Sequence, residues 1–207
     1  MMPFDLARLG EDRLFLVLSA AERLKQNNIG IIRTLTGQGY RVVVITTNQP
    51  SAVLRRLYTA EGIELSKVFF IDAITKYAMG RVPEGEVQCR FVNSPSNLTD
   101  LGIAITEVLN TLSGEKACLL FDSISTMLIY IPSTHISKFI HFITSKLRLV
   151  DASGIFLAVE KGLDPLLLTQ LTTYVDGVID MDSHAAAPPQ KEGGQEGEGP
   201  RQSSPVL

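Results

Sequence analysis

The chain lacks tryptophan and is poor in other aromatic side chains, since five tyrosines and nine phenylalanines make up 7% of its 207 residues. Surfaces that bind single-stranded nucleic acids stack the bases on aromatic rings, so this composition disfavours such a surface. The formal net charge of −3 at pH 7 provides no basic footprint for a phosphate backbone either. The composition therefore disfavours nucleic acid as a partner.

Cysteine is scarce as well, with only Cys89 and Cys118, far apart in the chain. A disulfide framework or a zinc site needs more thiols, or a Cys/His cluster at ligand spacing. The three histidines show no such spacing. We therefore expect no metal site and interpret both cysteines as small core residues.

Long apolar runs and a leader are also missing. No apolar stretch approaches the about 18 residues that suggest a membrane-spanning helix. The first five residues lack the basic region and the apolar run of a signal peptide. These absences predict a cytoplasmic protein that does not associate with a membrane.

What the sequence does have is a regular alternation of short apolar runs with longer segments of helical periodicity. The β-branched, continuously apolar run at 41–46 is typical of a buried parallel strand. The alternation predicts an α/β fold with a mainly parallel sheet and helices on both faces. The expected strands are 13–18, 41–46, 68–72, 87–92, 117–122, 155–159 and 178–181, and the expected helices are 19–37, 52–61, 98–112, 134–150 and 166–174.

The composition changes abruptly at His184 to alanine, proline, glycine, glutamine and glutamate. Beyond that point Val206 and Leu207 are the only bulky apolar residues. Such a segment cannot bury enough apolar surface to offset its ordering entropy. We expect one domain over residues 1–183 and a disordered tail over residues 184–207.

The junction between the first strand and the first helix carries the main functional signal. Nucleotide-binding α/β domains place a glycine-rich phosphate loop there, of the form G-x-x-x-x-G-K-[ST]. In this chain Ser19 and Leu24 stand at the glycine positions, and Gln26 stands at the hydroxyl position. Only Lys25 remains, so the sequence predicts a degenerate phosphate loop.

Ser19 and Glu22 have the spacing of a capping box. In this interpretation the Ser19 hydroxyl accepts a hydrogen bond from the Glu22 N–H, and the Glu22 carboxylate accepts one from the Ser19 N–H. A carboxylate would then occupy the positive end of the helix, where a phosphate would otherwise bind. The sequence thus predicts an anion site filled by the protein itself.

Segments along most of the chain resemble the KaiC-like branch of the RecA superfamily of P-loop ATPases, in an archaeal-type form with a degenerate Walker A motif. They are the junction with Lys25, 46–50, 70–73, the Walker B-like 119–123, and 174–179. The resemblance implies a RecA-like P-loop NTPase fold with a five-stranded parallel core and an added edge strand. It also implies a nucleotide site at the carboxyl edge and, in active relatives, a ring with ATP between subunits.

Departures from that family concern the catalytic residues. Active relatives place two glutamates after the second strand to activate water, and Thr47 and Asn48 stand at these positions. Neither side chain ionises near neutral pH, so neither can act as a general base. The resemblance leaves a vestigial nucleotide site of Lys25, Asp122 and Ser123. Asp122 either orients a metal-bound water or caps the turn that follows it, and Lys25 either meets an anion or pairs with a neighbouring acid.

Two hypotheses follow for the function. The leading one is a non-hydrolysing ATPase homologue, without cofactor or catalytic residues, that acts as a regulatory or protein-interaction module. The alternative is an ATP-binding protein or weak magnesium-dependent ATPase with an atypical phosphate loop. Under the first hypothesis the partner is another protein or a second copy of the chain. Residues 77–86 and 129–132 are candidate contact surface, although we favour a buried helix at 129–132.

Overall fold

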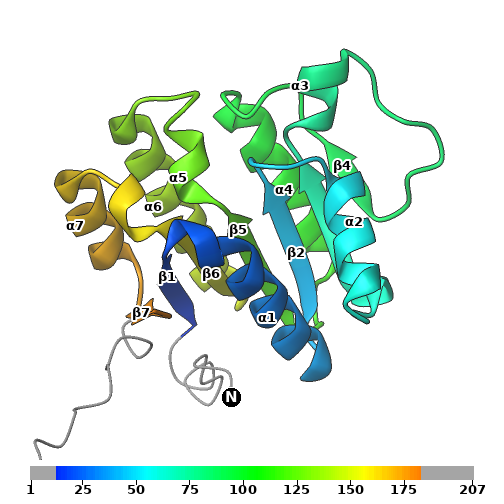
Figure 1. The fold of residues 1–207 in the computed structure, drawn as a ribbon, viewed down its shortest axis with the longest axis horizontal. Coiled ribbons are helices and arrows are strands. Elements are labelled where there is room, and N and C mark those ends of the chain that lie inside the picture. The colour runs from blue at the N-terminus through cyan, green and yellow to red at the C-terminus, as the bar shows by residue number, and fades with distance from the viewer. Residues whose placement is uncertain (1–12, 183–207) are drawn as a thin grey trace, which may run out of the picture.

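The sheet at the centre of the protein has seven strands, and every neighbouring pair in it is parallel (Figure 1). The computed structural model describes residues 13–182, so the predicted tail at 184–207 lies outside the described residues. The strand order is β4-β3-β2-β5-β6-β1-β7. The strands are β1 (Leu14–Ser19), β2 (Arg41–Thr46), β3 (Val68–Asp72), β4 (Cys89–Phe91), β5 (Ala117–Asp122), β6 (Ser153–Val159) and β7 (Gly177–Asp180).

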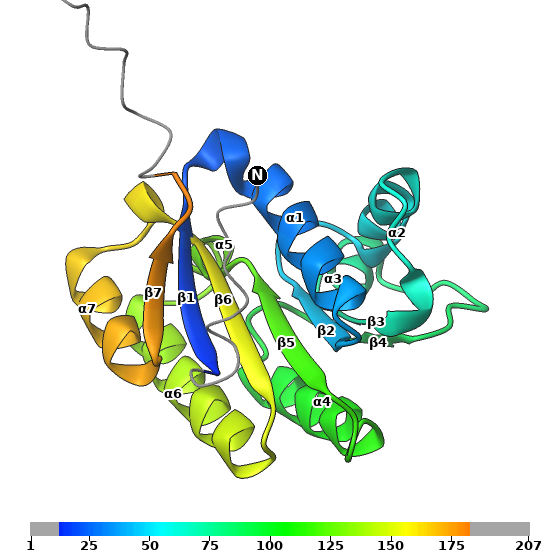
Figure 2. The same cartoon turned by 90° about the horizontal axis from the view of Figure 1, so that it is seen from below.

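The longer helices cover both faces of this sheet, as the alternating sequence pattern predicts. Figure 2 shows α1 (Leu24–Gly37) and α2 (Ser51–Ala60) on one face, with α4 (Leu98–Thr111) and α6 (Ser133–Leu149) on the other. The helix α7 (Pro165–Tyr174) packs on the same face as α4 and α6. Two short helices, α3 (Thr75–Met79) and α5 (Ile124–Met127), follow β3 and β5. The α/β architecture is therefore confirmed.

Coverage of both faces explains why the strands are continuously apolar. All six residues of β5 are buried, and so are all six residues of β1. On the helices only one stripe is buried, at the spacing that the sequence predicts for α6. Its buried apolar residues are Ile136, Phe139, Ile140, Ile143 and Leu147. The buried apolar residues form two cores, one between each face of the sheet and the helices that cover it.

The two edge strands are where the sheet differs from expectation. The resemblance implies five parallel strands and one added edge strand, whereas the structure has seven parallel strands with β4 and β7 at the edges. The strand expected at 87–92 shrinks to β4 because Gln88 has a φ of 55°, outside the extended region. Val87 is 75% exposed and does not continue the strand.

Parallel pairing places the carboxyl ends of β1, β2, β3 and β5 at the same edge of the sheet. These ends carry polar residues that are buried: Ser19, Thr46, Asp72 and Asp122. In open α/β sheets this edge is where ligands bind. No helix within residues 13–182 has the length and apolarity needed to cross a bilayer.

Candidate functional site

The junction after β1 does not form the predicted capping box. Ser19 is still a strand residue, paired in register with Val159, so it cannot serve as a helix N-cap. Its hydroxyl donates to the carbonyl oxygen of Ala20 at 2.9 Å and accepts from Asn27 Nδ2 at 2.8 Å. A 3₁₀ turn over Ala21–Arg23 follows, and α1 begins only at Leu24. The prediction of a Ser19–Glu22 box is therefore wrong.

A different carboxylate lies at this junction. Asp182, just after β7, accepts a hydrogen bond from the backbone N–H of Ala20. Its other oxygen lies 3.3 Å from a guanidinium nitrogen of Arg23. Asp182 lies 162 residues from Ala20 along the chain, so no local sequence pattern indicates this contact. The backbone donor at the start of the turn is thus bound by an acidic group of the protein itself.

Thr47 and Asn48, which stand where active relatives have two glutamates, differ from each other in burial. Thr47 is buried, and its hydroxyl lies 3.0 Å from the carbonyl oxygen of Ser123 and 2.8 Å from Thr126 Oγ1. These bonds tie the end of β2 to the start of α5. Asn48 is exposed at the same edge of the sheet. Thr47 therefore has a structural role, and Asn48 borders a cavity.

That cavity brings Lys25 and Asp122 together. It has a volume of about 190 Å³. Its lining consists of Ala21, Leu24, Lys25, Asn28, Asn48, Gln49, Leu54, Leu57 and Asp122. Ser123 does not line it, although the Ser123 side chain is completely buried and its hydroxyl has no hydrogen-bond partner. The exposed residues Lys25 and Asn48 form the mouth of the cavity, and the buried Asn28 and Asp122 form its floor.

Asp122, at the end of β5, carries a buried carboxylate at the carboxyl edge of the sheet. Its side chain is 5% exposed, and no hydrogen bond within residues 13–182 contributes to the shift of its pKa. Burial raises the pKa of this carboxyl from 3.8 to about 6, because the ionised form loses hydration without gaining a partner. The start of α5 at Ser123 has no side-chain cap. The capping interpretation of Asp122 is therefore wrong.

Asp72, at the end of neighbouring β3, shows what a structural carboxylate looks like here. It is completely buried, and its two oxygens accept four hydrogen bonds. The donors are the backbone N–H groups of Ser51, Ile74 and Thr75 and the Thr75 hydroxyl, at 2.6–2.8 Å. Asp72 thereby caps the N-termini of α2 and α3. Two acids that end buried strands in the same way have opposite surroundings.

Asn28 and Tyr58 belong to the site but are absent from the sequence-based predictions. The buried Tyr58 hydroxyl donates to Asn28 Oδ1 at 2.7 Å, and burial raises the pKa of Tyr58. The Asn28 amide is held through its oxygen, while its buried Nδ2 has no hydrogen-bond partner. An asparagine within the buried stripe of α1, just before Ile29, was the available sequence signal.

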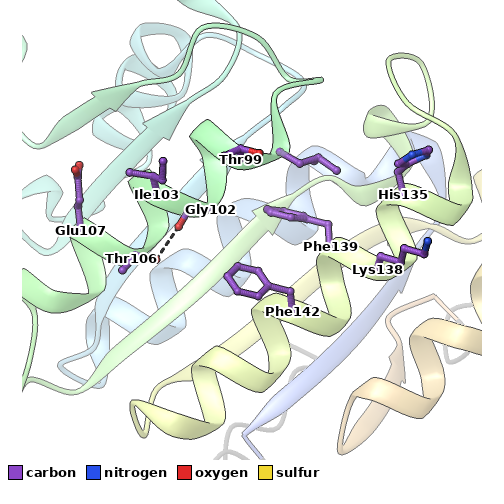
Figure 3. Close-up of a pocket in the computed structure, with 10 residues that line it drawn as sticks. Thr99, Gly102, Ile103, Thr106, Glu107, His135, Lys138, Phe139 and Phe142 are labelled. Carbon is purple, nitrogen blue, oxygen red and sulfur yellow. Dashed lines mark hydrogen bonds between the residues drawn. The ribbon is translucent and has the colours of Figure 1, made fainter.

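A second hollow lies between α4 and α6 on one face of the sheet. This groove has a volume of about 570 Å³ and is lined mainly by apolar atoms. Figure 3 shows the Phe139 and Phe142 rings extending from α6 toward α4. Phe142 and Ile103 are each about half exposed, at 50% and 52%. The remaining lining residues are Leu98, Thr99, Gly102, Thr106, Glu107, His135 and Lys138.

The charges at this groove are unequal. On α4, Glu107 is neutralised by an ion pair with Arg90 at 2.7 Å. On α6, Lys138 lines the groove, and Lys146 lies 6.0 Å from the centre of the Phe142 ring. The rim contributed by α6 is therefore basic, while the floor is apolar.

Two tyrosines of the proposed contact surface, Tyr77 and Tyr130, lie in the segments that follow β3 and β5. Ile129 follows the end of α5 and is 75% exposed, so the expectation of a buried helix at 129–132 is wrong. The Tyr130 ring packs edge-on against Tyr77, with ring centres 5.8 Å apart. This contact joins the two segments that the sequence offered as contact surface, and Tyr77 is itself 56% exposed.

Metal ligands are not clustered in the described part of the chain. Residues 13–182 contain no group of three or more His, Cys, Asp or Glu side chains that could hold a metal ion. Cys118 is fully buried, and Cys89 is partly buried with its thiol 3.5 Å from the Ser51 hydroxyl.

Comparison with known proteins places the chain in a family and a fold. A model of a family of unknown function, DUF7504, matches residues 20–181. The uncharacterised protein PH0321 of Pyrococcus horikoshii, solved in complex with an unknown peptide, is 12% identical with a TM-score of 0.62. The alignment covers 87% of this chain and 84% of that one.

A KaiC-like protein of Pyrococcus horikoshii OT3, PH0186, is 16% identical with a TM-score of 0.60. It aligns over 81% of this chain and 71% of its own. The fold is thus KaiC-like, as the sequence resemblance implies. No curated protein matches the chain in sequence.

Proposed function

We propose that this chain, which belongs to the DUF7504 family of unknown function, is a RecA-like domain that does not hydrolyse ATP and serves as a protein-interaction module. The observation that carries the proposal is the junction after β1. There the Ala20 N–H is bound by the Asp182 carboxylate, and a 3₁₀ turn replaces a glycine-rich loop. An arriving phosphate would meet a negative charge without the array of backbone donors that normally offsets it.

The remaining parts of the edge support the same proposal. Phosphoryl transfer depends on positioning and charge stabilisation around the phosphates. The cavity that holds Lys25 and Asp122 has about 190 Å³, below the roughly 300–1,000 Å³ of common ligand pockets. Thr47 is engaged in hydrogen bonds and cannot act as a base. These residues do not fit magnesium and ATP together.

A nucleotide-binding assay tests the first half of the proposal. Isothermal titration with magnesium and ATP should give no saturable binding up to about 1 mM, which corresponds to less than about 4 kcal/mol of affinity. Steady-state phosphate release should equal that of the Lys25→Ala variant. The alternative function, an atypical ATPase, rests on Lys25 and Asp122 sharing one cavity. Turnover that Lys25→Ala abolishes would establish this alternative.

The groove between α4 and α6 supports the interaction role. Its apolar floor and basic rim fit an amphipathic segment of a partner protein that carries acidic side chains. The fold neighbour PH0321 was solved in complex with an unknown peptide, which supports the proposal that the groove takes a peptide segment. The surface formed by Phe142 and Ile103 would supply the apolar anchor points.

Selection from a random peptide library on the immobilised protein tests the groove. We expect enriched peptides with two or three apolar anchors and flanking acidic residues. Their affinity should fall at least about tenfold with Phe142→Asp or Lys138→Glu, because the first variant adds charge to the apolar floor and the second reverses the rim charge. Both positions are exposed, so the fold should persist.

Leu149→Asp is the matched control for this experiment. Leu149 ends the same helix, is 87% exposed and does not line the groove, so the control should bind as the wild type does. Enriched peptides that bind equally to Phe142→Asp would refute a role for the groove. Saturable self-association that Phe142→Asp abolishes would make a second copy the partner.

A further inference from the structure

The cavity at the carboxyl edge has an unsatisfied acceptor and an unsatisfied donor on its floor. Burial is the only influence that shifts the pKa of Asp122, with no hydrogen bond to its carboxylate among residues 13–182, and the buried Asn28 Nδ2 has no partner. Both side chains are more than nine-tenths buried and both line the cavity. Buried polar groups in native proteins are normally paired, and each exception calls for an explanation.

The fold fixes the positions of Asn28 and Asp122 at the cavity. Asn28 is anchored because Tyr58 donates to its Oδ1 at 2.7 Å, and its remaining donor is Nδ2 on the cavity floor. Asp122 is fixed at the end of β5, in register with Thr46 on β2. An ionised carboxylate in such a position loses hydration without compensation. Asn28 Nδ2 and the Asp122 carboxylate are thus held at the cavity without a partner for the hydrogen bonds they can make.

The mouth and the walls add a charge and an apolar surface. Lys25 lies exposed at the mouth, and none of the ion pairs among residues 13–182 includes it. The walls are the side chains of Leu24, Leu54 and Leu57. The cavity therefore combines a negative group inside, a positive group outside, an amide donor and an aliphatic surface.

This combination restricts the chemistry of a ligand. A phosphate would face the Asp122 carboxylate, and a bare metal ion would leave Asn28 Nδ2 without an acceptor. A matching molecule needs a cationic donor for Asp122, an anionic acceptor for Asn28 and Lys25, and a short apolar part. The volume of about 190 Å³ equals that of about six water molecules, which suits a molecule of roughly six to nine non-hydrogen atoms.

We propose that this cavity binds a free α-amino acid with a small aliphatic side chain. The ammonium group donates to the Asp122 carboxylate, and the carboxylate accepts from Asn28 Nδ2 and faces Lys25. The aliphatic side chain packs on Leu24, Leu54 and Leu57. This inference rests on the proposed function, because the carboxyl edge of the sheet is available to an amino acid only if it does not bind a nucleotide.

Isothermal titration of the full chain with alanine, valine and leucine tests the proposal. We expect saturable binding of at least one of them with a dissociation constant between about 10 µM and 1 mM. Two analogues of leucine separate the charges: isocaproic acid lacks the ammonium group, and isoamylamine lacks the carboxylate. Each should bind at least about tenfold more weakly than leucine, because each leaves one buried group unpaired.

Variants assign each contact. Asp122→Asn should weaken leucine and isoamylamine at least about tenfold without weakening isocaproic acid. Lys25→Gln should weaken leucine and isocaproic acid without weakening isoamylamine. Glu22→Gln removes a nearby exposed carboxylate that does not line the cavity, and it should leave all affinities unchanged. Denaturation curves confirm that each variant is folded.

Two results would overturn this inference. One is the absence of saturable binding of all three amino acids up to about 10 mM. The other is leucine binding that Asp122→Asn leaves unchanged. A parallel titration with magnesium and ATP tests the proposed function separately. Nucleotide binding that depends on Asp122 would overturn that function. If neither the amino acids nor ATP binds, only the amino-acid site is overturned.

Discussion

Asp122→Asn should make the protein more stable at pH 8. The wild-type carboxyl has its pKa raised by burial from 3.8 to about 6, so the folded state at pH 8 carries an ionised group that it disfavours. At 1.36 kcal/mol for each pKa unit, neutralising this group should raise the free energy of unfolding by about 3 kcal/mol. In a domain of this size the melting temperature should rise by roughly 6–12 °C.

The difference in stability between wild type and Asp122→Asn should depend on pH in a defined direction. Because the folded-state pKa is raised, the protonated Asp122 contributes its stability fully below pH 3.8, and this contribution is lost as the pH rises through about 6. Urea denaturation at a series of pH values should therefore show wild type and Asp122→Asn converging near pH 3.5 and diverging up to about pH 7. Equal stability at pH 8 would contradict the assignment of an unpaired buried charge.

Asp176→Asn supplies a control of opposite sign. Burial alone would raise the pKa of Asp176, but hydrogen bonds from Arg148 and from the backbone N–H groups of Arg13 and Leu14 lower it. Its ionised form therefore stabilises the folded state above the unfolded pKa, and this stability is lost as the pH falls through the folded value. Asp176→Asn should thus destabilise the protein at pH 8, whereas Asp122→Asn should stabilise it.

A stabilising substitution at Asp122 bears on function as well as on folding. A buried carboxylate without a partner lowers the stability of the fold, and groups with strongly shifted pKa values cluster at the functional sites of natural proteins. Asp122 borders a cavity with a second unsatisfied group, Asn28 Nδ2. The stability experiment and the amino-acid titration therefore examine the same property, the missing partner of one carboxylate.

Sequence periodicity was sufficient for the fold because each buried element carries a repeated signal. The strands β2, β3 and β5 begin and end at the predicted residues. The helix expected at 166–174 is found as α7, and Asp164 caps it by accepting a hydrogen bond from the Leu167 N–H at 2.8 Å. Strand ends controlled by backbone geometry were less predictable. The start of β4 depends on the positive φ of Gln88, and a glutamine in the sequence does not indicate such a backbone conformation.

The site was less accessible to sequence reasoning because its contacts join distant segments. Asp182 reaches the Ala20 N–H from the end of β7, whereas the local spacing of Ser19 and Glu22 indicated a capping box that does not form. The departure of residues 19–26 from the phosphate-loop pattern could be predicted from the sequence, because that motif has fixed spacing. The contact of Asp182 with the Ala20 N–H could not be predicted, because it depends on how β7 leaves the sheet beside β1.

Asp72 and Asp122 illustrate the same limit with a pair of residues. Each ends a buried apolar strand, and the sequence gives no reason to treat them differently. The structure separates them because the chain after β3 turns its backbone N–H groups toward Asp72, while the chain after β5 leads away from Asp122. The donors around each carboxylate, four for Asp72 and none for Asp122, distinguish the two acids and are set by the tertiary fold.

Asp72→Ala should therefore have the opposite effect, a loss of about 4 kcal/mol in the free energy of unfolding. The substitution leaves three backbone N–H groups and the Thr75 hydroxyl without their acceptor in a region closed to solvent. It also removes the cap shared by α2 and α3. Urea denaturation at pH 7 measures the loss, and the melting temperature should fall by on the order of 10 °C.

Asp72→Asn separates the hydrogen bonds from the volume of the side chain. Its amide oxygen can still accept from Ile74 and Thr75, but its amide nitrogen would face the Ser51 N–H, so about half of the loss should remain. Asp100→Ala is the matched control, since Asp100 accepts from the Asn93 backbone and side chain at the protein surface and should lose no more than about 1 kcal/mol. A loss at Asp72 as small as that at Asp100 would show that water replaces the carboxylate, and the contrast with Asp122 would then fail.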